Sequence, residues 1–152
     1  MKYLFFEKIT YNSKLNIEEV YGILYEYIEE NIGIYEETSK PFIGKIEGNT
    51  FSITKTDNSW SKSTQTQIDG IISENIDGSY IVVKMRPNTV FIFISLFFLG
   101  YFIKNIIYKE NFYLSLISIC FLLITELFSF NYQSKKLKKQ LQEIFKANII
   151  TE

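Results

Sequence analysis

The feature that most constrains the fold is a 42-residue stretch, Thr89 to Phe130, which contains only four charged residues. It overlaps two uncharged runs, 17 residues from Pro87 to Ile103 and 15 residues from Asn111 to Thr125. A helix that spans a membrane needs about 20 mainly apolar residues, within a range of about 17 to 25. Both runs continue as apolar sequence beyond a single charge, Lys104 in the first and Glu126 in the second. Each run is therefore long enough to predict a membrane span.

The alternative interpretation is a pair of buried helices in a soluble protein. Helices of soluble proteins carry a polar stripe along their length, and the segment from Val90 to Ile103 carries none. A chain of 152 residues also has little other material to cover two such helices. We therefore predict a two-helix transmembrane hairpin in residues 87–133, with helices at about 88–108 and 111–132.

Lysine and arginine near the ends of the spans predict their orientation, because these residues are retained on the cytoplasmic side. Lys84 and Arg86 precede the first helix, whereas Lys104 and Lys109 lie near the connecting loop. A basic group that we expect at the membrane surface follows the second helix: Lys135, Lys136, Lys138 and Lys139. The first ten residues also lack the apolar run of a signal peptide. We expect a protein of the bacterial inner (cytoplasmic) membrane with both termini in the cytoplasm.

Residues 1–86 carry a net charge of −4, from 9 Lys and Arg against 13 Asp and Glu, and read as a cytosolic α+β domain. A first strand is expected from Lys2 to Tyr11. Asn16 and Glu19 have the spacing of a capping box, which predicts a helix that starts there and stops near Gly33. From Pro41 the apolar residues alternate with polar ones, as in strands joined by tight turns. We predict about five antiparallel strands plus one helix.

The predicted sheet buries one set of side chains against that helix: Phe42, Ile46, Phe51, Ile53, Ile68, Ile71, Tyr80 and Val82. Residues 134–152 form a third region, with a net charge of +3, and predict a C-terminal amphipathic helix. Its apolar side includes Leu137, Leu141 and Phe145. This helix either packs on the sheet or lies on the membrane with its lysines against anionic lipid, and we favour packing on the sheet.

Several stretches together resemble a known family: "GKIEGNTFSITKT", Asn58-Ser59-Trp60, "IDGIISE" and "DGSYIVVKMRPNTVFIF" with its Met85-Arg86 pair. The resemblance covers roughly residues 41–100 and is to a family of small, uncharacterised bacterial membrane proteins. It implies a β-rich cytosolic domain followed by two transmembrane helices, and it implies no activity. The sequence departs from the family at Asp57, where an arginine is expected.

The second apolar segment carries polar residues on one side. At 100° per residue, five of them fall within an arc of about 100°. They are Ser115, Ser118, Thr125, Glu126 and Ser129. This transmembrane polar face packs against the first helix, or it forms an oligomer contact or pore lining. In an antiparallel pair centred on residue 110, Glu126 faces Ile94 and Ser95 rather than Lys104.

The sequence offers no frame for catalysis. It has no His, a single Cys and no Gly-rich phosphate loop, and we predict no catalytic residue, no cofactor and no metal. An acidic domain without a basic face also argues against nucleic acid as a partner. Four residues remain as ligand or lipid-headgroup contacts: Asn58, Trp60, Lys84 and Arg86.

These observations predict a non-enzymatic integral membrane protein. Its cytosolic domain recognises a ligand or partner, and its membrane helices anchor it or signal through self-association, as in a membrane effector. The alternative is an accessory or assembly subunit of a larger membrane complex. The expected partners are the lipid bilayer and either further copies of the chain or the subunits of such a complex.

Overall fold

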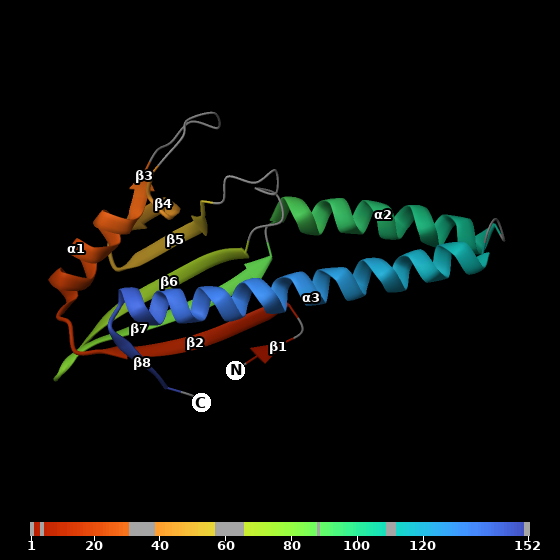
Figure 1. Ribbon diagram of the computed structural model, residues 1–152. Coiled ribbons are helices and arrows are strands. Elements are labelled where there is room, and N and C mark those ends of the chain that lie inside the picture. The colour runs from red at the N-terminus through yellow and green to blue at the C-terminus, as the bar shows by residue number, and fades with distance from the viewer. Residues whose placement is uncertain are drawn as a thin grey trace.

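The computed structural model describes residues 2–3, 5–30, 39–56, 66–87, 89–108 and 112–150. These residues form a curved sheet with helices on one face, which makes two layers. A long pair of helices projects from one end of the sheet (Figure 1). The elements are β1 (Lys2–Tyr3), β2 (Phe6–Ser13), α1 (Ile17–Tyr27), β3 (Ile28–Glu30), β4 (Phe42–Glu47), β5 (Thr50–Lys55), β6 (Thr66–Asn75), β7 (Gly78–Pro87), α2 (Thr89–Ile107), α3 (Phe112–Ile144) and β8 (Ala147–Ile150).

The described residues contribute eight strands to the sheet, seven of them in the order β1-β2-β7-β6-β5-β4-β3, and β8 pairs with β2 beside β1. All neighbours are antiparallel except β3 and β4, which run parallel. The two longest strands, β6 and β7, pair from Thr66 opposite Pro87 to Asn75 opposite Gly78. β7 ends at Pro87 and α2 begins at Thr89, so the sheet leads almost directly into the projecting helices.

Helix α1 begins where the capping box predicted it. The Glu19 N–H donates to Asn16 Oδ1 at 2.8 Å, and the Asn16 N–H donates to Glu19 Oε2 at 2.8 Å. Two of the four amide donors that a helix start leaves unpaired are typically satisfied in this way. The helix ends earlier than predicted, because Ile28 is already extended and begins β3. Gly33, the expected stop, lies outside the described residues.

The C-terminal half of α3 lies on the same face of the sheet as α1. Its apolar side, with Leu137 and Leu141 followed by Phe145, is buried in the core with Tyr11 and Phe51. The favoured prediction that this segment packs on the sheet is therefore confirmed. After the helix, Lys146 adopts a left-handed conformation, with φ 46°, and the chain turns into β8.

The predicted fold class is wrong in three respects. The sheet has eight strands rather than about five, and it is mixed rather than purely antiparallel. The C-terminal amphipathic helix is not a separate element, because α3 runs unbroken from Phe112 to Ile144 through the predicted boundary at residue 134. No Gly or Pro interrupts that stretch, so the backbone has no reason to leave the helix.

The predicted two-helix transmembrane hairpin is also corrected. Among the described residues, one helix is long and apolar enough to cross a membrane, Tyr113–Ile144. Only 11% of its apolar 18-residue stretch is buried inside the protein. In α2 the corresponding described segment, Ser95–Ile107, is shorter than a span requires. α2 and α3 nevertheless pack side by side along the projection (Figure 1). We call α2 and residues 112–132 of α3 the helical arm.

Candidate functional site

A polar contact joins the two helices of the helical arm in the half nearer the sheet. The Ser95 hydroxyl on α2 donates a hydrogen bond to the Glu126 carboxylate on α3. The predicted antiparallel register, in which Glu126 faces Ser95 and not Lys104, is confirmed at this point. Ser115, another residue of the predicted polar face, is only 3% exposed. Two members of that face are therefore directed into the arm rather than away from it.

The other members of the predicted polar face find partners on α3 itself. The Ser118 hydroxyl donates to the Leu114 carbonyl at 2.8 Å, and the Thr125 hydroxyl donates to the Leu122 carbonyl at 2.8 Å. The Ser129 hydroxyl accepts a hydrogen bond from Gln133 Nε2 at 3.3 Å. Ser118 and Thr125 therefore place their hydroxyl protons on carbonyls of their own helix and need no partner helix as acceptor, whereas Ser129 is seen only as an acceptor.

A joint of polar side chains fixes α3 where it leaves the sheet. Gln133 Oε1 accepts from both the N–H and the hydroxyl of Thr66, each at 3.0 Å, at the first residue of β6. Glu7 on β2 is 5% exposed; it accepts from the hydroxyl of Ser134, the next residue of α3, and forms an ion pair with Lys138 about one turn further along. This joint ties the helix to two strands and sets the direction in which the arm projects.

Tyr11, which is fully buried, adds a contact between β2 and α3 on the core side of the joint. Its hydroxyl donates to the Lys138 carbonyl at 3.3 Å. Burial, and next the negative charge of Glu7, raise the pKa of Tyr11 above its ordinary value. The tyrosine is therefore neutral and remains a hydrogen-bond donor throughout the physiological range.

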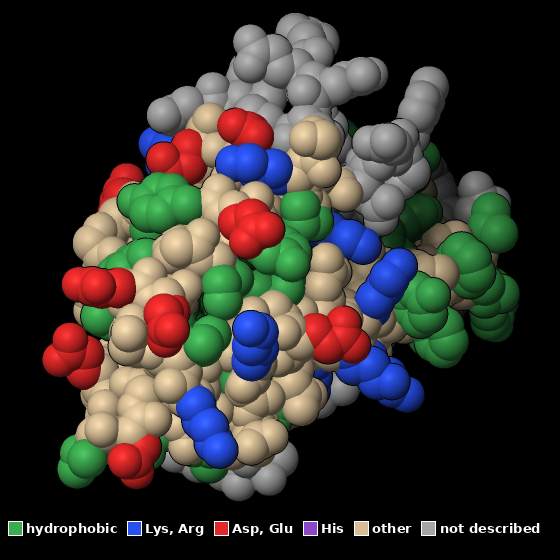
Figure 2. Space-filling model, turned by 60° about the vertical axis from the view of Figure 1, so that its left-hand side comes forward, with side chains coloured by type: hydrophobic (Ala, Val, Ile, Leu, Met, Phe, Trp, Pro, Cys, Tyr) green, Lys and Arg blue, Asp and Glu red, His purple; other side chains and the backbone are tan. Residues whose placement is uncertain are grey.

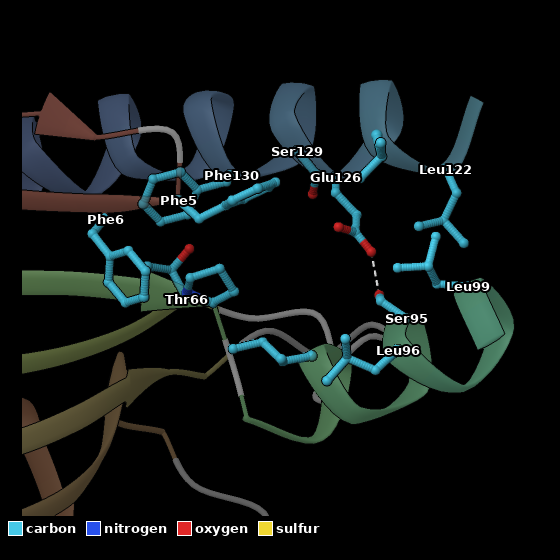
Figure 3. Close-up of a pocket in the computed structure, with 13 residues that line it drawn as sticks. Phe5, Phe6, Thr66, Ser95, Leu96, Leu99, Leu122, Glu126, Ser129 and Phe130 are labelled. Carbon is cyan, nitrogen blue, oxygen red and sulfur yellow. Dashed lines mark hydrogen bonds between the residues drawn. The ribbon is translucent and has the colours of Figure 1, made fainter. Parts of the chain in front are cut away.

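A pocket of about 280 Å³ opens at the root of the arm, between the two helices and the end of the sheet (Figure 3). We call it the root pocket. Its walls are almost wholly apolar, with Phe6 and Phe130 at the sheet end and Leu99 and Leu122 further along the arm. The polar groups on its walls are the hydroxyls of Thr66, Ser95 and Ser129 and the carboxylate of Glu126. Among the residues that line it, only Glu126 is charged.

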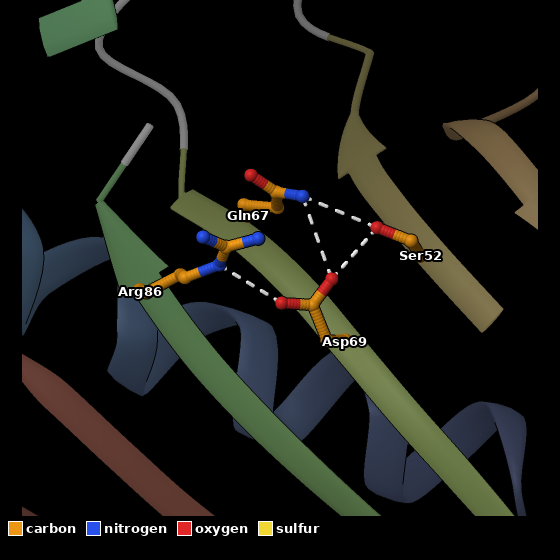
Figure 4. A network of polar contacts seen from close by, with 4 residues as sticks. All are labelled: Ser52, Gln67, Asp69 and Arg86. Atoms are coloured by element: carbon orange, nitrogen blue, oxygen red, sulfur yellow. Dashed lines mark hydrogen bonds and ion pairs between the residues drawn. The ribbon is translucent and has the colours of Figure 1, made fainter. Parts of the chain in front are cut away.

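The face of the sheet opposite α1 and α3 carries a second polar cluster (Figure 4). We call this the open face, because no helix lies on it in the part of the chain that the structure describes. Arg86 Nε donates to Asp69 Oδ2 at 2.9 Å, and Ser52 donates to Asp69 Oδ1 at 2.7 Å. Gln67 Nε2 completes the cluster by donating to Ser52 Oγ at 3.2 Å.

Beside this cluster, the open face is hollowed by a shallow pocket of about 330 Å³. Its lining mixes apolar side chains, Ile71 and Val82, with charged ones, Lys45 and Lys84. Ile71, Tyr80 and Val82 all lie on this face, since their neighbours Ile72, Ile81 and Val83 are the buried residues of β6 and β7. The prediction that Ile71, Tyr80 and Val82 belong to the core is therefore wrong.

The predicted ligand or headgroup contacts are only partly placed. Lys84 is exposed on β7 and Arg86 is paired with Asp69. Asn58 and Trp60 lie outside the described residues. Of the predicted membrane-surface lysines, Lys135, Lys136 and Lys139 are exposed, whereas Lys138 turns toward the sheet to pair with Glu7.

The residues of the joint were not identified from the sequence, although the alternation along β2 contained one indication of Glu7. Glu7 alternates with Ile9 and Tyr11 along β2, so a strict period of two places its carboxylate on the buried face. A buried carboxylate needs a cation or hydrogen-bond donors, and α3 supplies both. Nothing local in the sequence marks Gln133 or Thr66 as partners.

The linings of the two pockets determine what each could bind. No group of three or more metal-ligating side chains occurs among the described residues. The lining of the root pocket suits an apolar molecule with a small polar end. The open face suits a ligand or protein whose own surface mixes polar and apolar groups. Comparisons with known protein families, curated proteins and solved structures found no match for this chain. The resemblance to small bacterial membrane proteins stays a prediction.

Proposed function

We propose that this chain is a non-enzymatic, membrane-anchored recognition protein of the bacterial cytoplasmic membrane. The apolar part of α3, residues 113–132, lies in the lipid with α2 packed beside it, and the sheet domain lies on the cytoplasmic surface. The observation that carries this proposal is the exposure of the arm: 18 of the 23 large hydrophobic side chains exposed in the described chain belong to residues 92–132. Phe97, Phe121 and Phe128 are 76%, 68% and 76% exposed. Soluble monomers rarely expose apolar patches of more than a few hundred Å².

The dimensions of the arm agree with a bilayer. Tyr113 lies near the tip and Tyr132 near the root, and both side chains are exposed. At 1.5 Å per residue, the 19 residues between them span about 28 Å, close to the roughly 30 Å of a hydrocarbon core. Tyrosine is enriched at both membrane–water interfaces, so these two residues mark where we place the two boundaries along α3.

The charges around the root support a cytoplasmic position for the sheet. Lys135, Lys136 and Lys139 are exposed on α3 just after the arm. Figure 2 shows most of the visible Asp and Glu side chains on the side away from the arm and several Lys and Arg side chains between them and the hydrophobic arm. Cations beside a membrane segment favour the cytoplasmic side and attract anionic lipid. β1 and β8 both pair with β2, so both ends of the described chain lie with the sheet, and in this proposal they share its cytoplasmic position.

The open face is the surface that we assign to recognition of a ligand or partner. It carries exposed apolar area at Ile71, which is 44% exposed, next to the Arg86–Asp69 ion pair. The arm acts as an anchor in this proposal rather than as a pore, because Ser118 and Thr125 are satisfied by their own helix and Glu126 by Ser95.

The chain contains one cysteine, Cys120, which is exposed on the arm and provides the test. In membrane vesicles prepared from expressing cells, we expect a charged maleimide to leave Cys120 unlabelled until detergent is added. The matched control is Ile76→Cys in a Cys120→Ser background, because Ile76 lies in the β6–β7 turn and is 99% exposed. That cysteine should react without detergent in inside-out vesicles and be protected in intact cells.

Two outcomes contradict the proposal. Rapid labelling of Cys120 in sealed vesicles would show that water reaches the middle of the arm. Collapse of the membrane potential on expression, abolished by Glu126→Ala at equal protein level, would replace the anchor with a pore. Purification in a fixed ratio with other membrane subunits would favour the accessory-subunit alternative.

A further inference from the structure

We propose that the root pocket binds one hydrocarbon chain that ends in an uncharged hydroxyl, such as a long-chain alcohol or a lipid with a free hydroxyl on its glycerol. The inference rests on the proposed membrane position of the arm and adds a ligand site to it. The pocket has about 280 Å³ of space, near the lower end of ordinary ligand pockets. It therefore suits part of one chain with a small head rather than a whole two-chain lipid.

The position of the pocket indicates that the apolar part of the ligand is a hydrocarbon chain, because the pocket opens beside the lipid in the proposed membrane position. Its walls continue the apolar surface of the arm, from Phe6 and Phe130 at the sheet to Leu99 and Leu122 about two turns along. Glu126 is seven residues from Gln133, which is fixed to the sheet at Thr66, so the carboxylate lies roughly 10 Å along the helix from the root. A hydrocarbon chain from the cytoplasmic leaflet that enters the pocket therefore carries its hydroxyl to this depth, below the membrane surface.

The polar groups of the pocket select the head of the ligand. The Glu126 carboxylate accepts the hydrogen bond that Ser95 donates to one of its oxygens, and its second oxygen is a further acceptor. Ser129, one turn along the same face, accepts from Gln133 and keeps its own proton to donate. Both side chains point into the pocket, and Ser95 stands opposite Glu126 (Figure 3). A hydroxyl is both donor and acceptor, so it can donate to Glu126 and accept from Ser129 at once.

The same groups disfavour charged heads. A phosphate or a carboxylate brings a negative charge next to Glu126, and no Lys or Arg is among the residues that line the pocket. Like charges in a poorly solvated site repel strongly. A primary ammonium can pair with Glu126, but it has no lone pair to accept from Ser129. The neutral hydroxyl is the head that matches both.

The test is native mass spectrometry of the full chain released from detergent micelles, with probes that share one oleyl chain. The probes are oleyl alcohol, oleic acid, oleyl phosphate and oleylamine. We expect one bound oleyl alcohol per chain, held roughly tenfold or more tightly than either anion, as expected for the loss of a hydrogen bond to a charged group. Glu126→Gln should reduce the preference for the alcohol over oleic acid to roughly threefold or less, because it removes the repulsion.

A pair of neighbouring substitutions separates a pocket from general adhesion to the arm. Leu123→Trp fills the pocket that Leu123 lines, whereas Ile124→Trp places the same ring on the adjacent exposed position outside it. Only Leu123→Trp should abolish the bound alcohol. Equal loss in both variants, equal binding of all four probes, or tighter binding of oleylamine would overturn the inference. Protection of Cys120 in the sealed vesicles, measured before the protein is extracted with detergent, reports membrane insertion separately, so failure of the pocket and failure of the anchor give different results.

Discussion

Phe51 lies directly over Gly70 on the neighbouring strand, and this contact shows how closely the core is packed at the residue scale. A Cβ added at Gly70 would lie 2.0 Å from Cζ of Phe51. The Phe51 ring is buried and also contacts Phe145, with ring centroids 6.2 Å apart. The absence of a side chain at position 70 is thus what allows an aromatic ring to join the sheet to the end of α3.

We predict that Gly70→Ala lowers the free energy of unfolding by about 1–3 kcal/mol, because overpacking a filled core costs that much. Gly22→Ala is the control: Gly22 lies on α1 with nothing within 4 Å of an added Cβ, and it should stabilise the helix by about 0.5–1 kcal/mol. Thermal unfolding in detergent measures both. A Gly70→Ala protein as stable as the wild type would contradict the packing described for Phe51.

Tyr11 predicts how stability depends on alkaline pH. Its pKa is raised in the folded protein, so the folded state holds the phenol proton more tightly than the unfolded chain does. The resulting stability is complete below the ordinary tyrosine pKa of about 10 and is lost as the pH rises through the folded value. We expect Tyr11→Phe to have a shallower loss of melting temperature than wild type between about pH 9 and 11. Equal slopes would contradict the assignment.

At the scale of single residues, the sequence predicts where a strand lies better than it predicts which of its two faces is buried. Ile71 and Ile72 are adjacent and equally apolar, as are Ile81 and Val82. A period of two fits either choice, and a shift of one residue exchanges the two faces of a strand. Phe51, Ile53 and Ile68 were assigned correctly because polar residues flank them. The other assignments depended on which face α3 covers.

At the scale of elements, the joint between α3 and β2 determines how the helix sits on the sheet. We predict that Glu7→Ala lowers the free energy of unfolding by about 2 kcal/mol. Removing one partner of a fully buried pair costs about 3–5 kcal/mol, and the value here is smaller because the Lys138 side chain is 30% exposed and can turn to water. Lys139→Ala, on the exposed side of the same helix, should change stability by less than about 0.5 kcal/mol.

Calorimetry or thermal unfolding followed by circular dichroism measures both variants. The double variant Glu7→Ala/Lys138→Ala should cost less than the sum of the two single changes, because the two side chains interact directly. Strict additivity would show that the ion pair contributes nothing to the joint.

Element lengths explain why the fold class was predicted incorrectly. β1, β3 and β8 have two, three and four residues. Such strands are too short to show an alternating pattern, and they form because longer neighbours offer them an edge. The capping box at Asn16 was predictable because it is local. The unbroken course of α3 was not, because the change from apolar to basic composition near residue 134 alters the surroundings of the helix without altering its backbone.

At the scale of the whole molecule, the position of the arm predicts how the protein responds to added charge. Phe121 is exposed in the apolar part of the arm. We predict that Phe121→Arg moves much of the protein from the membrane fraction to aggregates, because a cation near the centre of a span costs about 2.5–3.5 kcal/mol on insertion scales. Tyr132→Arg, at the root, should remain in the membrane. Centrifugation after an alkaline wash distinguishes the two results, and equal behaviour would contradict the boundaries proposed for the arm.

The arm was predictable from composition alone, but the root pocket was not. Apolar runs interrupted by few charges indicate lipid or core wherever they occur. The pocket depends on the angle at which α3 leaves the sheet, and that angle is set by contacts between residues far apart in sequence, such as Thr66 with Gln133 and Glu7 with Ser134.

The pairing of β8 with β2 also has a consequence for the order of events during synthesis. β2 leaves the ribosome early with its partner β1, but its other two partners come later: β7, made just before the arm, and β8, made just after α3. Ala147–Ile150 cannot reach their places beside residues 10–13 until the whole arm has been translated. In the proposed membrane setting, the arm therefore enters the lipid while this edge of the sheet is still incomplete, and the cytoplasmic domain finishes folding only on a chain that is already anchored.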